Sequence, residues 1–196
     1  MKEWRSAGRF LQIPMLMHTE ENVKSLLNSM ITVSDNESYN QLIRILGKGS
    51  FAGGCSYINK YIQKKGGISR VHHTLHPARS NHQSDGLGSN VSSAKDIGLL
   101  LERIYRKKAV SSKYSSEMMN MLLRQQRTWK IPAGLPYGVK CANKTGETDA
   151  NQHDAAIVYG KKTDYVIVIF SATTEYYGIN GMNRVSRMVY DYLNGK

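Results

Sequence analysis

The sequence is poor in cysteine, which excludes a fold held together by a framework of disulfides. It has two cysteines, Cys55 and Cys141, in 196 residues, and neither belongs to the Cys-x-x-Cys pairs typical of metal sites. We therefore expect both to be buried as small apolar residues. The sequence also lacks any apolar run approaching about 20 residues, and its N-terminus has no uninterrupted apolar segment. This predicts a chain with neither a membrane span nor a signal peptide.

Acidic residues are scarce as well. The chain has 15 acidic and 27 basic residues, which gives a formal net charge of +12. Such a charge can favour nucleic acid or other anionic polymers, but no nucleic-acid motif accompanies it, so we expect no nucleic-acid partner. The basic clusters lie on or beside the polar faces of predicted helices, which favours solvated faces, with attraction to anionic polymers as the alternative. The clusters are Lys60, Lys64 and Lys65; Arg103, Arg106, Lys107 and Lys108; and Arg124, Arg127 and Lys130.

Apolar spacing predicts helices first and strands later in the chain. The helices are expected from Thr19 to the polar stretch at residue 34, at about 37–46 and 55–65, from near Ser92, at about 115–125, and at 183–193. A glycine-rich turn is expected at 47–54, and strands at 137–144, 153–159 and 165–172. The last helix should cover the sheet with Val185, Met188, Val189, Tyr192 and Leu193. The order predicts an α/β (α+β) fold, with an antiparallel sheet flanked by helices.

Three consecutive polar residues, Ser34, Asp35 and Asn36, interrupt two apolar helical patterns. A polar loop between two core helices is held rigidly, as a catalytic hydroxyl requires. The alternative is that Ser34 or Asn36 only caps the second helix.

A second tripeptide, Lys144-Thr145-Gly146, follows the first expected strand. Together the two tripeptides supply a hydroxyl able to relay a proton, an amide, a cation and a glycine that lets a ligand approach the strand. With them the chain resembles the class A β-lactamase and penicillin-binding serine hydrolase family, whose signatures are Ser-x-x-Lys, Ser-Asp-Asn and Lys-Thr-Gly in that order. The resemblance covers nearly all of these residues but only part of the family's fold.

The resemblance implies how the chain is divided into lobes, and it implies that two strands of the family's sheet are missing. Residues 1–18 would be the remnant of an N-terminal region, 19–131 an all-helical lobe, and 132–196 three strands and the closing helix of an α/β lobe. The family's sheet has two further strands from the N-terminus, which this sequence lacks. The strand at 165–172 would then have an open edge, so we expect a homodimer or swapped dimer through it, or cover from the chain's own N-terminal residues.

The resemblance also implies the roles of single residues. Ser34 would relay a proton to the leaving nitrogen, and Asn36 would help to fix the substrate amide. Lys144 and Thr145 would bind the substrate carboxylate, and Gly146 would keep the strand clear for it. The backbone N–H of Glu147 would donate to the oxyanion. Asp35 is expected to be buried and to hold the loop by hydrogen bonds.

The nucleophile signature is absent from its place, because residues 1–33 contain no Ser-x-x-Lys. The sequence Ser92-Ser93-Ala94-Lys95 matches the pattern, but on the wrong side of Ser34, and serine is common at a helix N-cap. We expect Ser92 or Ser93 to be a cap, with a nucleophile as the alternative.

The segment from Ser69 to Asn90 contains His72, His73, His76 and His82. We expect a solvated loop, with a metal site as the alternative, and no cofactor. In the resembled family this is the omega loop, whose glutamate activates the deacylating water. This chain has no glutamate between Glu37 and Glu102.

The resemblance implies a serine hydrolase that opens β-lactams or peptidoglycan-type amides through an acyl-enzyme and acts outside the cytoplasmic membrane. Without the nucleophile we expect this chain to be inactive or impaired. The alternatives are a non-catalytic module that binds peptidoglycan or β-lactams, and a remnant with no function.

Overall fold

The computed structural model describes residues 19–75 and 82–195, and the described residues form two compact units, one up to Asp96 and one from Ile97 on. The expected N-terminal remnant at 1–18 and His76 lie outside the described residues. The boundary between the units lies between Asp96 and Ile97. Helix α6 (Ser112–Leu122) belongs to the second unit, because it contacts the first strand of the sheet. The lobe boundaries implied by the resemblance, 19–131 and 132–196, stay a prediction.

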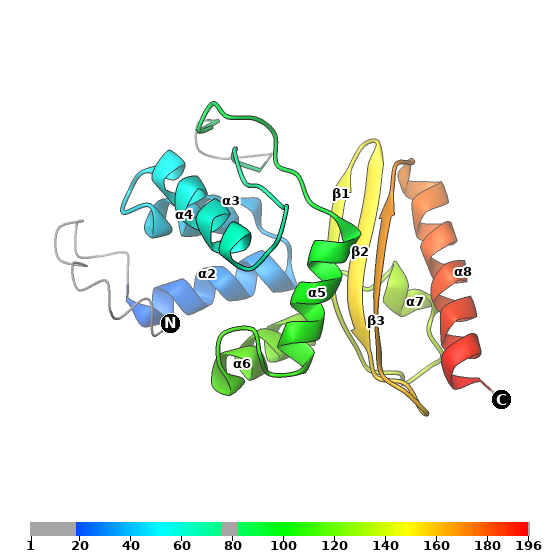
Figure 1. The fold of residues 1–196 in the computed structure, drawn as a ribbon. Coiled ribbons are helices and arrows are strands. Elements are labelled where there is room, and N and C mark those ends of the chain that lie inside the picture. The colour runs from blue at the N-terminus through cyan, green and yellow to red at the C-terminus, as the bar shows by residue number, and fades with distance from the viewer. Residues whose placement is uncertain (1–18, 76–81, 196) are drawn as a thin grey trace. The chain divides into compact units, whose positions relative to one another are not determined.

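The first unit contains the helices α2 (Glu20–Thr32), α3 (Asn36–Leu46) and α4 (Phe51–Lys64), with α3 against both others (Figure 1). Thr19 caps α2 as predicted, its hydroxyl accepting from the Asn22 N–H at 3.2 Å. The core between α3 and α4 consists of Ile43, Phe51 and Cys55, and Cys55 is fully buried, as expected.

The expected glycine-rich turn at 47–54 is too long. Helix α4 begins at Phe51, because the Ser50 hydroxyl accepts from the Gly53 N–H at 3.1 Å and caps it. Gly54 lies inside the helix, and a Cβ there would stand 1.9 Å from the Ile43 carbonyl oxygen. The glycine therefore serves close helix packing rather than a turn.

The second unit contains an antiparallel sheet in the order β1-β2-β3, which confirms the expected fold class. The strands are β1 (Cys141–Thr148), β2 (Asn151–Val158) and β3 (Tyr165–Ser171). The first strand begins four residues later than predicted, because a turn closed by the Val139 N–H on the Pro136 carbonyl precedes it, with Gly138 at φ 81°. The tripeptide 144–146 therefore lies within β1 instead of following it.

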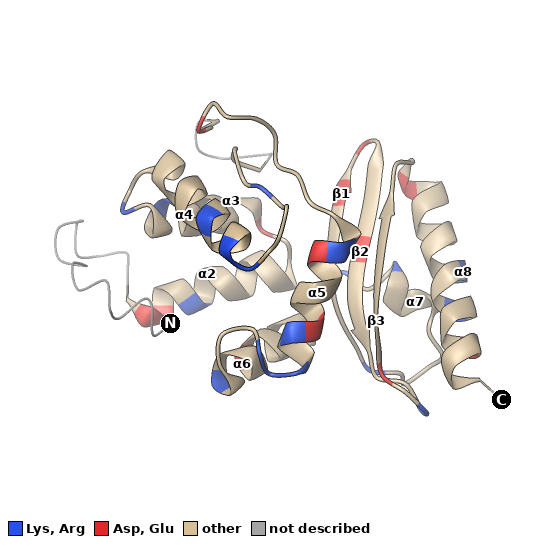
Figure 2. Cartoon of the chain, viewed as in Figure 1, with Lys and Arg blue, Asp and Glu red and all other residues tan. Residues whose placement is uncertain are grey.

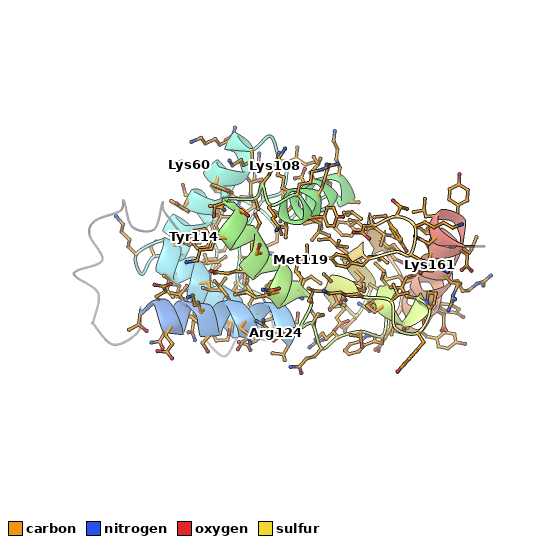
Figure 3. The ribbon with its side chains drawn as sticks, turned by 90° about the horizontal axis from the view of Figure 1, so that it is seen from below. Lys60, Lys108, Tyr114, Met119, Arg124 and Lys161 are labelled. Atoms are coloured by element: carbon orange, nitrogen blue, oxygen red, sulfur yellow. The ribbon has the colours of Figure 1, made fainter. Side chains whose placement is uncertain are left out.

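Helices cover both faces of this sheet (Figure 1). They are α5 (Ala94–Tyr105) and α6 on one side, and α7 (Ile131–Gly134) and α8 (Glu175–Asn194) on the other. The core beneath α7 and α8 contains Ile131, Leu135, Ala156, Val158 and Tyr190. Figure 3 shows the side chains of α6, with Tyr114 and Met119 labelled. None of the described helices is long and apolar enough to cross a bilayer.

Helix α8 covers the sheet as predicted, and Val189 and Leu193 are partly buried, but the other three residues of the expected face are not. Val185, Met188 and Tyr192 are exposed, at 43, 68 and 88% of their surface. The buried residues recur every four positions: Gly178, Met182, Ser186, Tyr190 and Asn194. Small residues decide the face, because Gly178 and Ser186 permit a close approach that a row of larger side chains would prevent.

Basic residues are spread over most elements (Figure 2). The three clusters singled out in the sequence lie at the end of α4, at the end of α5, and beyond α6. Lys130, counted with the third cluster, is not on a solvated face, since its side chain is fully buried.

Candidate active site

The Ser34 turn joins α2 and α3 in a strained conformation. The N–H groups of Val33 and Asp35 both donate to the Ser29 carbonyl at 3.2 Å, which closes the end of α2. Between them Ser34 has φ 61°, in the left-handed region that non-glycine residues rarely adopt. Strain of this kind persists where the surrounding structure imposes it, and it is concentrated at functional sites.

Asp35 is the N-cap of α3, and Asn36 is its first residue. The Asp35 Oδ2 accepts from the Ser38 N–H at 2.7 Å, so the carboxylate holds the loop as expected. The expected burial is wrong, because Asp35 is exposed. Of the two caps considered for this helix, Ser34 and Asn36, neither is the observed one.

A buried amide on α3 holds this helix against the segment that follows α4, and sequence reasoning missed it. Asn40 is fully buried, and its Oδ1 accepts from the Leu75 N–H at 2.9 Å while its Nδ2 donates to the Leu75 carbonyl at 3.3 Å. An asparagine that satisfies both backbone groups of one residue acts as a fixed cross-link. The sequence held one signal for this contact, because Asn40 is a polar residue among the apolar positions of a predicted helix.

The described part of the histidine-rich segment is a loop held by two isolated bridges, exposed over most of residues 82–89 as expected and half-buried at His72 and His73. Backbone bonds pair Arg70 with Val91 and His73 with Ser84, and the His72 Nδ1 lies 2.9 Å from the Asp85 Oδ2. These side chains are 13% and 7% exposed, and the hydrogen bond from His72 holds the pKa of Asp85 below its usual value against the effect of burial. Among the described residues no group of histidine, cysteine and acidic side chains is placed to hold a metal ion.

The hydroxyls of Ser92 and Ser93 have different partners, and neither partner is Lys95. The Ser93 hydroxyl accepts from the Asp96 N–H at 3.1 Å, as in a helix cap, and the Ser92 hydroxyl lies 2.9 Å from that of Ser69. Lys95 is exposed. The capping interpretation is therefore confirmed for Ser93.

In the second unit, β1 carries Lys144, Thr145 and Gly146 opposite Ala155, Asp154 and His153 of β2. Burial, and then the charge of Arg127, lower the pKa of Lys144 to about 8. Its Nζ donates to the Thr145 carbonyl at 2.6 Å. Thr145 is 4% exposed and is held by the strand pairing.

The Asp154 carboxylate joins β1 to α7 by hydrogen bonds. Its carboxylate accepts from the Ile131 N–H at 3.0 Å, the Ala155 N–H at 2.9 Å and the Asn143 Nδ2 at 3.1 Å. Burial raises the pKa of this carboxyl to about 6, although these donors lower it. Asp154 therefore fixes the strand that carries Thr145 without belonging to either tripeptide.

Lys130 was grouped with a basic surface cluster, but it lies against this strand. Its side chain is fully buried, and its Nζ donates to the carbonyls of Gly146 and His153 at 3.2 and 3.3 Å and lies 2.9 Å from the Glu147 Oε2. The Glu147 Oε1 receives a hydrogen bond from Arg127. Nothing in the spacing of the sequence indicated this contact, since Lys130 lies 17 residues before Glu147.

The two tripeptides belong to different units, so the structure describes each half of the proposed site by itself. Ser34, Asp35 and Asn36 lie in the first unit and residues 144–147 in the second. Their joint action on one substrate stays a prediction.

Comparisons with known proteins give a family match and a set of similar solved structures. A sequence model described as the beta-lactamase enzyme family matches residues 11–193. No curated protein sequence matches the chain.

Solved structures share the fold. The structure of PBP-A aligns with a TM-score of 0.70 at 23% identity, over 87% of this chain and 60% of that one. A beta-lactamase from Sphaerobacter thermophilus aligns with a TM-score of 0.72 at 19% identity, over 87% and 62%. A PBP-A variant solved as an acyl-enzyme complex with penicillin G gives 0.71 at 25% identity, over 93% and 67%. The chain thus spans less than two thirds of the length of the first two, as the resemblance implied.

Proposed function

Because this chain belongs to the beta-lactamase enzyme family, we propose that it is a β-lactamase-like serine hydrolase that recognises β-lactams or peptidoglycan-type amides. The observation that carries the proposal is the family match, which extends over both Ser34 and Lys144. We place its action outside the cytoplasmic membrane.

The proposed roles follow the chemistry of the groups present. The Ser34 hydroxyl relays a proton to the leaving nitrogen, and Asn36 helps to fix the substrate amide. Lys144 and Thr145 bind the substrate carboxylate beside Gly146. The N–H of Glu147 donates to the oxyanion that forms in the tetrahedral intermediate.

Acylation requires a nucleophile that residues 1–33 do not supply, since they hold no Ser-x-x-Lys. Loss of a nucleophile lowers turnover by about 10⁴- to 10⁶-fold. We therefore propose that this chain as given recognises its ligand without turning it over at an appreciable rate.

Calorimetric titration with penicillin G tests recognition. We expect saturable binding that weakens at least about tenfold in Lys144→Ala, because the cation facing the ligand carboxylate is lost. Lys161→Ala, at an exposed loop position of the same unit, is the matched control and should bind like the wild type (Figure 3). Equal affinities for the two variants would contradict the role of Lys144.

The intact mass after incubation with excess penicillin G tests turnover. We expect no covalent adduct. A stoichiometric adduct that disappears in Ser92→Ala would show that Ser92 is a nucleophile after all.

A second candidate function is a non-catalytic module that binds peptidoglycan, and the absence of the nucleophile signature from residues 1–33 favours it. Binding of a peptidoglycan stem peptide without an adduct supports this module. No binding of either ligand supports a remnant without function.

A further inference from the structure

A fully buried lysine lies against the strand that carries the Lys-Thr-Gly tripeptide. Lys130 is 0% exposed, and its ammonium group has three acceptors: the carbonyls of Gly146 and His153 and the carboxylate of Glu147. An ammonium group has three N–H donors, so these acceptors account for all of them. A buried cation needs this degree of satisfaction, because leaving one donor unpaired in a low-dielectric site is costly.

The acceptors differ in their ability to move. Gly146 and His153 face each other across the β1–β2 ladder, and their carbonyls are held by the sheet. The Glu147 carboxylate is on a rotatable side chain that is 31% exposed. An external anion can therefore reach Lys130 by displacing the Glu147 carboxylate, but not by displacing either carbonyl.

Glu147 also neutralises the other cations near the tripeptide. Its second oxygen receives a hydrogen bond from Arg127, which is 33% exposed. Side chains alternate along a strand, so Glu147 lies on the same face of β1 as Thr145, which the proposed function assigns to the ligand carboxylate. Burial alone would raise the pKa of Glu147, but the hydrogen bond from Lys130 and the nearby charges lower it. The carboxylate is thus ionised at neutral pH.

We propose that the Glu147 side chain is a specificity-determining residue, an internal carboxylate that occupies the anion position beside Thr145 and so favours ligands with a neutral group there. This inference rests on the proposed function, because it takes Thr145 as the ligand-binding residue. A ligand that presents a free carboxylate has to compete with Glu147 for Lys130 and Arg127. A ligand that presents a carboxamide does not.

Two matched ligands test the inference: N-acetyl-D-alanyl-D-alanine and its C-terminal carboxamide, titrated into the full chain by calorimetry. We expect the wild type to bind the acid no more than about threefold more tightly than the amide. Glu147→Gln keeps the shape of the side chain and removes its charge, so it should raise the preference for the acid at least about tenfold. Glu175→Gln, at an exposed glutamate in the first turn of α8, should leave the ratio unchanged.

If Glu147→Gln does not fold, the ratio of the affinities of the wild type for the acid and the amide still decides the test. A wild-type chain that prefers the acid at least tenfold overturns the inference. So does a folded Glu147→Gln variant whose acid-to-amide ratio equals that of the wild type.

Sulfate separates a failure of this inference from a failure of the proposed function. If neither dipeptide binds, the proposed ligand class is wrong, and thermal unfolding with added sulfate at constant ionic strength decides about Glu147. A larger sulfate-dependent rise in melting temperature in Glu147→Gln than in Glu175→Gln shows that Glu147 occupies an anion site. Equal rises show that it does not.

Discussion

At the scale of single residues, the Ser34 turn keeps a serine where glycine would be less strained. A left-handed conformation costs a non-glycine residue about 1–2 kcal/mol, and Ser34 adopts it at φ 61° between two helices. Because backbone strain is concentrated at functional sites, this conformation supports the proposed role of the Ser34 hydroxyl.

We predict that Ser34→Gly stabilises the chain by up to about 1 kcal/mol, because relief of the backbone strain exceeds the added entropy of the unfolded chain. Urea unfolding measures the change. Ser25→Gly, at an exposed position inside α2, is the matched control and should destabilise by about 0.5–1 kcal/mol. Equal destabilisation by both variants would show that Ser34 is not strained.

Asp154 is a buried carboxyl whose pKa of about 6 exceeds its unfolded value of 3.8. The folded chain therefore binds this proton more tightly than the unfolded chain does. The contribution to stability is fully present below pH 3.8 and is lost as the pH rises through about 6.

We predict that the stability of the wild type, measured relative to Asp154→Asn, falls by on the order of 3 kcal/mol between pH 4 and pH 7. The uncharged amide of the variant does not titrate, so the difference isolates this carboxyl. Urea midpoints at several pH values provide the measurement. A difference that stays constant or increases with pH would show that the pKa of Asp154 is not raised.

At the scale of elements, α8 shows how small residues decide which face of a helix is buried. A Cβ on Gly178 would stand 2.6 Å from the Gln152 Cβ of β2, and the Ser186 hydroxyl donates to the Ile131 carbonyl at 2.8 Å. These two contacts place the helix close to the sheet and to α7. The larger apolar residues Val185 and Met188 are left exposed in consequence.

We predict that Gly178→Ala destabilises the chain by about 1–3 kcal/mol, because the added methyl group forces α8 away from β2. Gly181→Ala, in the same helix with nothing within 4 Å of its added Cβ, should stabilise by up to about 1 kcal/mol. Thermal unfolding of both variants measures the effect. The reverse order would mean that α8 buries the face first predicted from its apolar residues.

At the scale of the whole molecule, the described part of β3 pairs with β2 alone. Its sequence from Val166 to Phe170 is uniformly apolar, and an unpaired edge of this kind promotes association. The chain's own N-terminal residues are the alternative cover for this edge.

We predict a homodimer or a swapped dimer through β3, which is seen in sedimentation velocity as a mass rising from 22.1 kDa with concentration. Phe170→Lys, which adds a charge at an exposed position of β3, should shift the chain to the monomer. Tyr192→Lys, at an exposed aromatic residue of α8, is the matched control and should not. A strict monomer whose β3 amides exchange freely with solvent contradicts both kinds of cover.

The sequence by itself determined the local features of this protein. Helical spacing located α2 and α3, the Thr19 and Ser93 caps lie where expected, and the apolar run in β3 matched within one residue. The two tripeptides led to the family because each is a contiguous pattern. Such signals depend on neighbours in the chain, which the sequence shows directly.

Only the tertiary structure decided which faces are buried and which charges meet. The face of α8 follows from how closely Gly178 approaches β2, and the burial of Lys130 follows from three acceptors on two strands. Asn40 and Leu75, like Lys130 and Glu147, are distant in the sequence and become partners only after the chain has folded. Contacts of this kind depend on distances that no pattern along the sequence encodes.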